Sequence, residues 1–559
     1  MSRMPRIAGE GRGRRIALVA GLAFAQAVAA GVAAFSTRDV FAALRNPEGA
    51  SALEPILLIA LSGFAIAGLR IAERVIAERV GQDYAAALRE KLFTHLSRMS
   101  AREVAGRRAG GLALRFVGDL SAVRGWVSLG AARLISASIV LPGAGVVLFM
   151  LDPLLGLAAV GPIILGLIAM SVVGWRIAPA HRRLRARRAR LAADMSERIP
   201  HAPELRLLGR IALEKDNLQR RTAKLIDAAL DRARGAGTLQ AIPDAASGLA
   251  AAALFLTAVK TGAAPAQVAG AMAALGLLLH PMRSLAGVWD KHRAWAAARE
   301  KCEALLNAPR LEKPAAAAKT SLREGPAPVR FRKVDAGSLR NLNAAARAGA
   351  RIAILGPNGA GKSTLLTLAA GLEQPARGKV TVAARHPGSF TAAERREAIA
   401  YVGARSPIFA GSLRRALTMG VASRPDDGEI ARVAADFGLA AVIARLGGLD
   451  GKIAEGGRNL SSGEARRVML ARAALSSSRL LLLDEPDDAL DADGPALVRR
   501  LLGMTDATAL IITHNLALAK AMDEVWFVDG GRVVETGAPE KLLAGDTAAS
   551  AFFSVRSVA

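Results

Sequence analysis

Leu460-Ser461-Ser462-Gly463-Glu464, followed by Leu480-Leu481-Leu482-Leu483-Asp484-Glu485, is the stretch that decides how this chain of 559 residues folds. A glycine-rich segment lies upstream of it, with the sequence Gly356-Pro357-Asn358-Gly359-Ala360-Gly361-Lys362-Ser363-Thr364. Downstream, His514 follows the apolar run 509–512. Each segment alone is weak evidence, whereas their order along one chain is specific enough to predict a fold and a chemistry.

The glycine-rich segment has the context of a phosphate-binding loop. Residues 351–355 predict a buried strand that leads into the loop, and a helix is expected to begin near Lys362. The loop glycines allow amide hydrogens to approach phosphate oxygens at the N-terminus of that helix. Lys362 is then placed to neutralise the β- and γ-phosphates of ATP, and the Ser363 hydroxyl to ligate Mg²⁺. A glycine-rich turn that binds nothing is the weaker alternative.

Two acids end the second predicted strand. The apolar run 480–483 delivers Asp484 and Glu485 at its end. We expect Asp484 to hold Mg²⁺ directly or through water, and Glu485 to accept a proton from the attacking water or to orient it. Paired acids after a strand can also be ordinary surface residues, but the phosphate loop in the same chain favours a catalytic role.

The composition favours a membrane protein over a soluble one. Hydrophobic residues make up 52% of the chain, and the mean hydropathy is +0.28. The net charge of +27 is compatible with nucleic-acid binding, but the arginines are not interleaved with aromatic residues that could stack on bases. Arginine-rich cytoplasmic loops explain the charge better. Cys302 is the sole cysteine, so no disulfide can form within the chain.

Apolar segments before residue 300 predict six membrane-spanning helices. The first, Ile16–Phe35, carries no charge, and a helix of about 20 residues crosses a bilayer core of roughly 30 Å. Arginines precede it and place the N-terminus in the cytoplasm, whereas the apolar core of a signal peptide is usually shorter. The other predicted spans are Pro55–Leu69, Leu134–Leu151, Leu154–Trp175, Gly237–Val259 and Val268 to about Trp289.

The segments between the predicted spans are strongly asymmetric. Those expected outside are short, and the two long ones expected inside cover residues 71–133 and 176–236. The second begins with a run of arginines between Arg176 and Arg190. Such a run could bind nucleic acid, but a helix that leaves anionic headgroups needs the same charge, and we favour the membrane interpretation.

Together, the segments between residues 351 and 514 resemble the ATPase domain of ABC transporters, and the six spans resemble the membrane domain of ABC exporters. The resemblance implies a multidomain half-size exporter, with an all-α six-helix domain at 1–308, a linker at 309–328 and an α/β P-loop ATPase domain at 329–559. Residues 111–119 and 204–209 match the family's intracellular loops. Short coupling helices are therefore expected near residues 97–108 and 198–206.

The same resemblance assigns roles within a dimer. The signature segment, Leu460–Glu464, is implied to reach the γ-phosphate of an ATP held by the partner's phosphate loop, and His514 to be the switch histidine that contacts the γ-phosphate. Glu455-Gly456-Gly457 resembles the segment that senses the coupling helices. Residues 488–491, which end at Asp491, resemble the loop that communicates between the two nucleotide sites.

The sequence departs from the family pattern in four places. Ser462 replaces a glycine of the signature and Glu464 replaces its glutamine, changes that keep a small residue and a polar helix start. Ala404 stands where a glutamine should reach Mg²⁺ and the attacking water, and residues 334–338 contain no tyrosine to stack on adenine. These last two departures predict weaker nucleotide affinity or slower turnover.

Asp244, His280 and Arg283 are polar residues at predicted membrane depth. They would be costly facing lipid. They are candidate contacts for a substrate or an ion, or else residues at a headgroup interface, a dimer seam or a kink. The apolar residues around them are compatible with a lipid, a drug, a peptide or a small amphiphile as substrate.

The expected function is ATP-driven membrane transport, by family analogy export, through ATP hydrolysis in a dimeric sandwich that drives alternating access. The expected partners are a second half-transporter, the lipid bilayer and an unidentified substrate, without nucleic acid. One alternative is a subunit of a heterodimer with a weakened nucleotide site. Another is an ATP-binding membrane sensor that transports nothing. The Ala-, Arg- and Gly-rich composition hints at a bacterial inner-membrane protein, with the N-terminus and the ATPase domain cytoplasmic.

Overall fold

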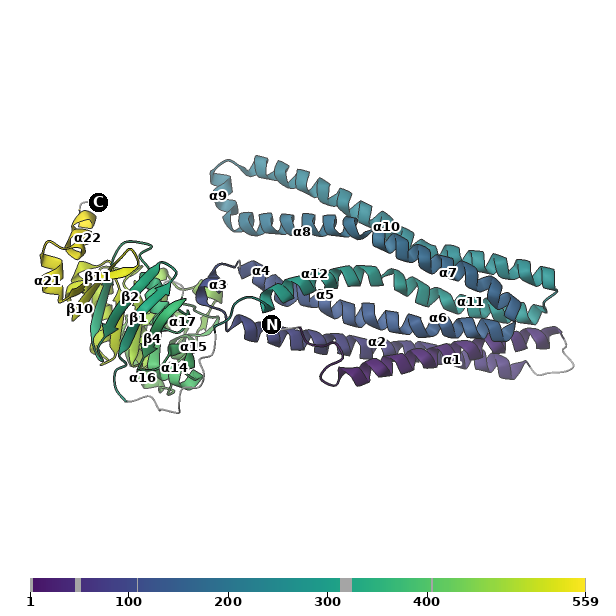
Figure 1. Ribbon diagram of the computed structural model, residues 1–559, viewed down its shortest axis with the longest axis horizontal. Helices are drawn as coiled ribbons and strands as arrows, with labels where there is room; N and C mark the ends of the chain where they lie inside the picture. Colours follow the sequence, from purple (N-terminus) through teal and green to yellow (C-terminus); the bar gives the residue numbers. More distant parts are fainter. Residues whose placement is uncertain (1–3, 46–51, 108, 312–323, 404–405, 558–559) are drawn as a thin grey trace. The chain divides into compact units, whose positions relative to one another are not determined.

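The computed structural model describes residues 4–45, 52–107, 109–311, 324–403 and 406–557. The chain divides into two compact units (Figure 1). The first, called the membrane unit here, comprises Met1–Ser97 and Arg107–Ala308. The second, called the ATPase unit, comprises Arg98–Gly106 and Pro309–Ala559. The short segment 98–106, which the sequence assigned to the first domain, therefore packs with the second unit.

The membrane unit is built from helices. In chain order these are α1 (Arg12–Arg45), α2 (Leu53–Leu96), α4 (Ala109–Leu114), the π-helical η1 (Arg115–Asp119), α5 (Leu120–Gly125), the π-helical η2 (Trp126–Ala131), α6 (Ala132–Leu151), α7 (Pro153–Arg176), α8 (Ala178–Arg198), the 3₁₀ turn η3 (Ile199–His201), α9 (Ala202–Leu207), α10 (Ile211–Thr261), α11 (Pro265–Ala286) and α12 (Val288–Leu306).

Six continuous helical segments of this unit are long and apolar enough to cross a membrane, as predicted. They are Arg12–Arg45, Leu53–Leu96, Gly111–Leu151, Pro153–Leu207, Ile211–Thr261 and Pro265–Leu306. Large apolar side chains point outward from them, with Phe64 81% and Leu61 65% exposed. A soluble protein rarely exposes continuous apolar surface of this kind, so lipid is the medium that fits these helices.

Small residues and local caps explain how the helices pack and turn. On α1, Ala23 and Ala34 are fully buried, which lets α1 lie close to α2, α6 and α11. The turn from α6 to α7 is made by Asp152, whose carboxylate accepts hydrogen bonds from the amides of Leu154 (2.9 Å) and Leu155 (3.1 Å). Pro153 occupies the first turn of α7, where a missing amide hydrogen has no cost.

Helices α8 and α10 run side by side, and the short helix α9 joins their ends (Figure 1). This arm contains the second region in which a coupling helix was expected, and α9 is a short helix at that place. Two leucines at the end of this arm are exposed to solvent, Leu207 by 87% and Leu208 by 68%.

The ATPase unit contains three sheets. Their strands are β1 (Val329–Ala336), β2 (Leu339–Ala346), β3 (Arg351–Leu355), β4 (Arg377–Val382), β5 (Ile399–Val402), β6 (Gly411–Ser412), β7 (Lys452–Ile453), β8 (Leu480–Asp484), β9 (Thr508–Ile512), β10 (Glu524–Asp529) and β11 (Arg532–Gly537). The main sheet has the order β11-β10-β3-β9-β8-β5, and β2-β1-β4 form a second, antiparallel sheet. Strands β6 and β7 pair as a small antiparallel sheet.

Helices cover these sheets. They are α3 (Ala101–Ala105), α13 (Lys362–Ala369), α14 (Ala392–Ala398), α15 (Leu413–Thr418), α16 (Asp427–Asp436), α17 (Ala440–Leu446), α18 (Ser462–Leu475), α19 (Gly494–Gly503), α20 (Leu516–Lys520), α21 (Pro539–Ala544) and α22 (Ala548–Ser557), with 3₁₀ turns η4 (Pro387–Ser389) and η5 (Glu455–Gly457).

The central strands of the main sheet are apolar except at their ends, which suits strands that are covered on both faces. β3, β9, β8 and β5 are parallel neighbours, with Ile354 beside Ile512 and Leu483 beside Ile511. All four of these residues are fully buried, as expected for parallel strands covered on two sides. The carboxyl ends of β3, β8 and β9 therefore lie at one edge of the sheet, which is where ligands bind in open α/β sheets.

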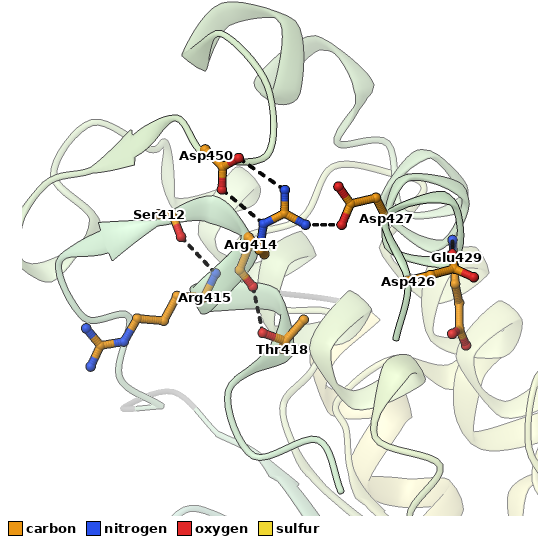
Figure 2. Close-up of polar contacts among 8 residues, drawn as sticks. All are labelled: Ser412, Arg414, Arg415, Thr418, Asp426, Asp427, Glu429 and Asp450. Atoms are coloured by element: carbon orange, nitrogen blue, oxygen red, sulfur yellow. Dashed lines mark hydrogen bonds and ion pairs between the residues drawn. The ribbon is translucent and has the colours of Figure 1, made fainter. Parts of the chain in front are cut away.

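A charged cluster joins the smaller helices of the ATPase unit (Figure 2). Arg414 on α15 donates to both carboxylate oxygens of Asp450, at 2.9 and 3.1 Å, and also pairs with Asp427 on α16. Asp426 caps α16 by accepting from the amide of Glu429 at 2.7 Å. One guanidinium thus ties α15 to α16 and to the loop before β7.

Candidate functional site

The phosphate loop joins β3 to α13, as the sequence predicts. Its backbone can be formed only by glycine at two places. A Cβ on Gly356, which has φ of 141°, would lie 2.0 Å from the carbonyl oxygen of Val528. A Cβ on Gly361, with φ of 106°, would lie 2.5 Å from the side chain of Leu339. The loop is therefore pressed against its neighbours, with its amides at the N-terminus of α13.

Lys362 is the first residue of α13 and is buried. Its ammonium group donates hydrogen bonds to the carbonyl oxygens of Gly356 (2.7 Å) and Pro357 (3.0 Å). The side chain thus folds back along the loop, and its charge lies beside the loop backbone. This is where a cation must be in order to pair with a phosphate cradled by the loop amides.

Asp484, at the end of β8, lies against the phosphate loop and is hydrogen-bonded to Ser363. Burial raises the pKa of the Asp484 carboxyl above its ordinary value, and the bond with Ser363 and the charge of Lys362 oppose the rise. A hydroxyl and a carboxylate side by side are hard oxygen ligands of the kind that Mg²⁺ takes. The residues present therefore fit Mg²⁺, and Ser363 and Asp484 stay the predicted protein ligands.

Glu485 follows Asp484 in an unusual backbone conformation. Its φ is 50°, in the left-handed region that a non-glycine residue seldom occupies. The amide of Glu485 donates to the carbonyl oxygen of Ile512 at 2.9 Å, which fixes the turn to the end of β9. Its carboxylate lies 3.1 Å from Nε2 of His514. The two catalytic candidates from different strands are thus in direct contact.

Three further residues of this edge, Asp487, Thr513 and Tyr401, were not identified from the sequence as parts of the site. Thr513, between β9 and His514, donates to the carboxylate of Asp487 at 3.3 Å, and burial raises the pKa of Asp487. Burial, with the nearby charge of Asp484, raises the pKa of Tyr401 to about 12. The only sequence signal for Asp487 was its position two residues after Glu485. Nothing in the sequence indicates that Tyr401 lies beside β8.

The signature segment forms the N-terminus of α18 through a capping box. The Ser461 hydroxyl accepts from the amide of Glu464 at 3.1 Å, and the Glu464 carboxylate accepts from the amide of Ser461 at 2.8 Å. The same carboxylate accepts from Arg445 of α17 at 2.7 Å. The Ser461 amide, followed by Arg445, holds the pKa of Glu464 below its usual range. The substituted glutamate is therefore ionised and paired.

The remaining segments named by the resemblance form turns. Residues 455–457 are the 3₁₀ turn η5, in which Gly456 has φ of 67°. In the segment 488–491, Ala489 has φ of 62°, and the carbonyl oxygen of Asp491 accepts from the amide of Gly494 at 2.8 Å. The Asp491 side chain is exposed. Their predicted roles in sensing and communication stay predictions.

Two departures from the family pattern bear on nucleotide binding, namely Ala404 and the missing adenine-stacking tyrosine. Ala404 lies outside the described residues. The place expected for an adenine-stacking tyrosine is the hairpin between β1 and β2, which turns at Gly337 with φ of 58°. In this short turn, residues 334–338 offer only valine, aspartate, alanine, glycine and serine.

The predicted first coupling helix is α3, which packs within the ATPase unit. Its N-cap is Ser100, whose hydroxyl accepts from the amide of Glu103 at 3.2 Å. The amide of Ala101 donates to the carbonyl oxygen of Leu372 (2.9 Å), and the amide of Arg102 donates to the Glu373 carboxylate (2.8 Å). The first amides of α3, which have no partner within the helix, are thus satisfied by the segment that follows α13.

Of the three polar residues identified in the predicted spans, two are in direct contact. Arg283 on α11 forms an ion pair with Asp244 on α10, with its Nε 2.9 Å from the carboxylate. His280 and Arg283 line a cavity of about 480 Å³ within the membrane unit, and Asp244 is not among its lining residues. The sequence identified these two basic residues but not the arginines of α2 and α6 that line the same cavity.

Two family models match the chain. Residues 17–267 match the ABC transporter transmembrane region, and residues 339–488 match the model described as ABC transporter. The chain is 27% identical over 507 residues to an uncharacterized ABC transporter ATP-binding protein, y4gM, of Sinorhizobium fredii, covering 86% of this chain and 84% of that protein.

Shorter similarity links the chain to a mycobactin import ATP-binding/permease protein, IrtB, of Mycolicibacterium thermoresistibile. The two are 36% identical over 294 residues, which cover 50% of this chain and 49% of that protein. Among solved structures, a bacterial Atm1-family ABC exporter with ATP bound superposes with a TM-score of 0.82. That match covers 97% of this chain and 98% of the other, at 23% identity, and shows the likeness of fold.

Proposed function

This chain belongs to the ABC transporter family, with the transmembrane region and the ATPase domain in one polypeptide, and we propose that it is a half-size exporter that works as a dimer. ATP is its energy source, and ATP hydrolysis drives the membrane helices between two conformational states. The observation that carries the proposal is the meeting of Glu485 and His514, 3.1 Å apart, at the same sheet edge as Asp484 and the phosphate loop.

The hydrolytic step follows from these side chains. Loop amides and Lys362 hold the β- and γ-phosphates and offset their charge. Ser363 and Asp484 would hold Mg²⁺, which would supply positive charge to the phosphate oxygens. Glu485 orients a water in line with the γ-phosphate and accepts its proton, while His514 fixes the Glu485 carboxylate by a hydrogen bond. Attack forms a bond from water to the γ-phosphorus and breaks the bond to the bridging oxygen, leaving ADP and phosphate.

A second copy of the chain, or a related half-transporter, completes the site. The capping box leaves the N-terminus of α18 intact as an anion-facing helix end, and we assign it to the γ-phosphate bound by the partner. The exposed Leu207 and Leu208 at the end of the α8–α10 arm fit a surface that a partner ATPase domain would cover. Closure around two ATP molecules then pulls on α3 and α9 as coupling helices and opens the membrane helices to the outside.

Export is the proposed direction, since the ATPase domain is fused to the membrane domain and the segments expected outside are short. Import is the second candidate, because the relative from Mycolicibacterium thermoresistibile is named as an importer of mycobactin. The same arrangement of domains is thus compatible with either direction, and the side of the membrane on which the substrate binds decides between them.

The test is Mg-ATP hydrolysis by the purified chain alone in lipid nanodiscs, beside Glu485→Gln. Loss of the base should lower turnover by about 10²- to 10⁴-fold and leave ATP binding intact. Glu397→Gln, an exposed glutamate elsewhere in the ATPase unit, is the control and should keep the wild-type rate. ATP binding without turnover in the wild-type chain would favour a heterodimer subunit or a sensor over a competent homodimer.

A further inference from the structure

The cavity of the membrane unit lies among α1, α2, η2, α6 and α11, and its ionisable lining is strongly basic. Its titratable residues are Arg70, Glu73, Arg74, Arg133, His280 and Arg283. Arg70 directly follows the apolar stretch of α2, and Arg133 directly precedes that of α6. The charges therefore gather at one end of the apolar spans, around a cavity between the helices, with Arg70 and Arg133 half-buried and Arg74, His280 and Arg283 exposed.

The single glutamate does not neutralise these arginines. One carboxylate oxygen of Glu73 accepts from the Gln26 amide at 2.6 Å, and the other accepts from the Ser136 hydroxyl. Both of its oxygens are thus bound by neutral donors. Of the four arginines, Arg283 alone has an acidic partner, Asp244 on α10.

The other three arginines form no ion pair among the described residues, although Glu78 interacts electrostatically with Arg74 at longer range. Within the part of the chain that the structure describes, no carboxylate lies at ion-pair distance from Arg70, Arg74 or Arg133. Nε of Arg70 is buried and has no hydrogen-bond partner there. Partly buried guanidinium groups without partners are costly, and an anion that enters the cavity recovers that cost through charge-assisted hydrogen bonds.

The rest of the lining combines apolar residues with four uncharged polar ones, Gln26, Ser128, Ser136 and Ser284. Ile66 and Val140 lie on the α2 and α6 sides, and Ala30 and Leu277 on the α1 and α11 sides. A ligand that satisfies both parts has an anionic head and a hydrocarbon body. The volume of about 480 Å³ falls within the range of small-molecule sites, roughly 300–1,000 Å³.

We propose that this cavity binds the transported substrate and that the substrate is an anionic amphiphile, with a phosphate or carboxylate head on Arg70 and Arg133. The proposal rests on the proposed transport function and gives its substrate class. Two sources share this chemistry, an anionic membrane lipid and a soluble acidic amphiphile. Arginines that only face lipid headgroups would be a simpler feature, but Arg70 and Arg133 are half-buried and line a cavity together with a glutamate held by two neutral donors.

The test uses the full chain in nanodiscs of zwitterionic lipid, without nucleotide, with empty nanodiscs to correct for partitioning. Dodecyl phosphate is the probe, and dodecyltrimethylammonium is the cationic control. We expect dodecyl phosphate to bind, and Arg70→Gln and Arg133→Gln each to weaken it about tenfold, the size expected for a lost charge-assisted bond. Arg70→Lys should restore part of the affinity. Arg79→Gln, on an exposed face of α2 outside the cavity, should leave it unchanged.

Equal binding of both amphiphiles, or no effect of Arg70→Gln and Arg133→Gln, would overturn the proposal. Phosphatidylglycerol added to the nanodiscs separates the two sources, since competition with the probe indicates a lipid headgroup and lack of competition indicates a soluble amphiphile. Either result supports the anionic class. Mg-ATP hydrolysis measured on the same preparations distinguishes a failure of the transport proposal from a failure of the substrate class. ATP hydrolysis without a preference for the anionic amphiphile would contradict only the substrate class.

Discussion

Glu464 shows how a substitution in a functional segment is compensated locally. A carboxylate at the start of a helix that faces phosphate would repel it, but this one is bound by the Ser461 amide and by Arg445. The capping geometry is available to glutamine as well as to glutamate, so the charge, which Arg445 compensates, is what differs from the family pattern.

Two variants of this pair should act in opposite directions. If the signature segment faces the γ-phosphate as proposed, Arg445→Gln leaves the Glu464 charge uncompensated there and should raise the KM for ATP severalfold. Glu464→Gln keeps the capping box without the charge and should leave the KM equal or slightly lower. Steady-state ATPase measurements at several ATP concentrations distinguish the two effects. A higher KM in Glu464→Gln would mean that the carboxylate itself is needed.

For single residues, the sequence was sufficient to predict the positions of those whose neighbours lie nearby in the chain. Lys362 in its loop and Asp484 at the end of its strand lie where the local pattern predicts them. Asp487 bonded to Thr513, and Glu464 paired with Arg445, could not be predicted, because each contact joins elements whose relative placement only the packed fold sets.

At the scale of elements, the proposed coupling role of α3 requires it to stay docked on the segment that follows α13. Ser100→Ala removes its N-cap, which costs about 1 kcal/mol, and should speed hydrogen exchange of the α3 amides roughly fivefold. Ser97→Ala, an exposed serine just before the segment, is the control. Hydrogen–deuterium exchange on the full chain measures both, and unchanged protection of α3 in Ser100→Ala would show that its docking does not depend on the cap.

The Arg414 cluster should make the smaller helices of the ATPase unit sensitive to acid (Figure 2). The two hydrogen bonds from Arg414 lower the pKa of Asp450 below its ordinary value. A carboxyl group whose pKa is lowered by folding stabilises the folded state at pH values above its unfolded-state pKa of about 4. This stabilisation is lost as the pH falls through the lower pKa of the folded state.

Melting temperatures of the full chain in detergent test this dependence. Asp450→Asn should melt slightly below the wild type at pH 7, and the difference should shrink as the pH falls from 5 to 3. A difference that is the same at every pH would assign the effect of the substitution to lost packing or hydrogen bonding rather than to the charge.

Elements that obey a local pattern were predicted well. The six spans and the strands 351–355 and 480–484 are at the expected places. The basic cavity was not predicted, because the sequence shows only that Arg70 and Arg133 lie beside apolar stretches. Only the packing of α1, α2, α6 and α11 shows that both line one cavity with His280 and Arg283.

For the whole molecule, the central claim is that ATP is held between the phosphate loop of one copy and the signature segment of another. The sole cysteine, Cys302, is buried and can be replaced by alanine to give a cysteine-free background. Asn358 in the loop and Ser462 in the signature are both exposed. Cysteines at these two positions should therefore approach each other across two copies when ATP closes them together.

The most direct measurement is the formation of a disulfide between copies of Cys302→Ala/Asn358→Cys/Ser462→Cys carrying Glu485→Gln, in lipid, with and without Mg-ATP. The account predicts a cross-linked dimer that forms rapidly with Mg-ATP and slowly without it, and that is absent from either single-cysteine variant. ATP binding by the same protein without nucleotide-dependent cross-linking would contradict the sandwich, and with it the proposed coupling of hydrolysis to transport.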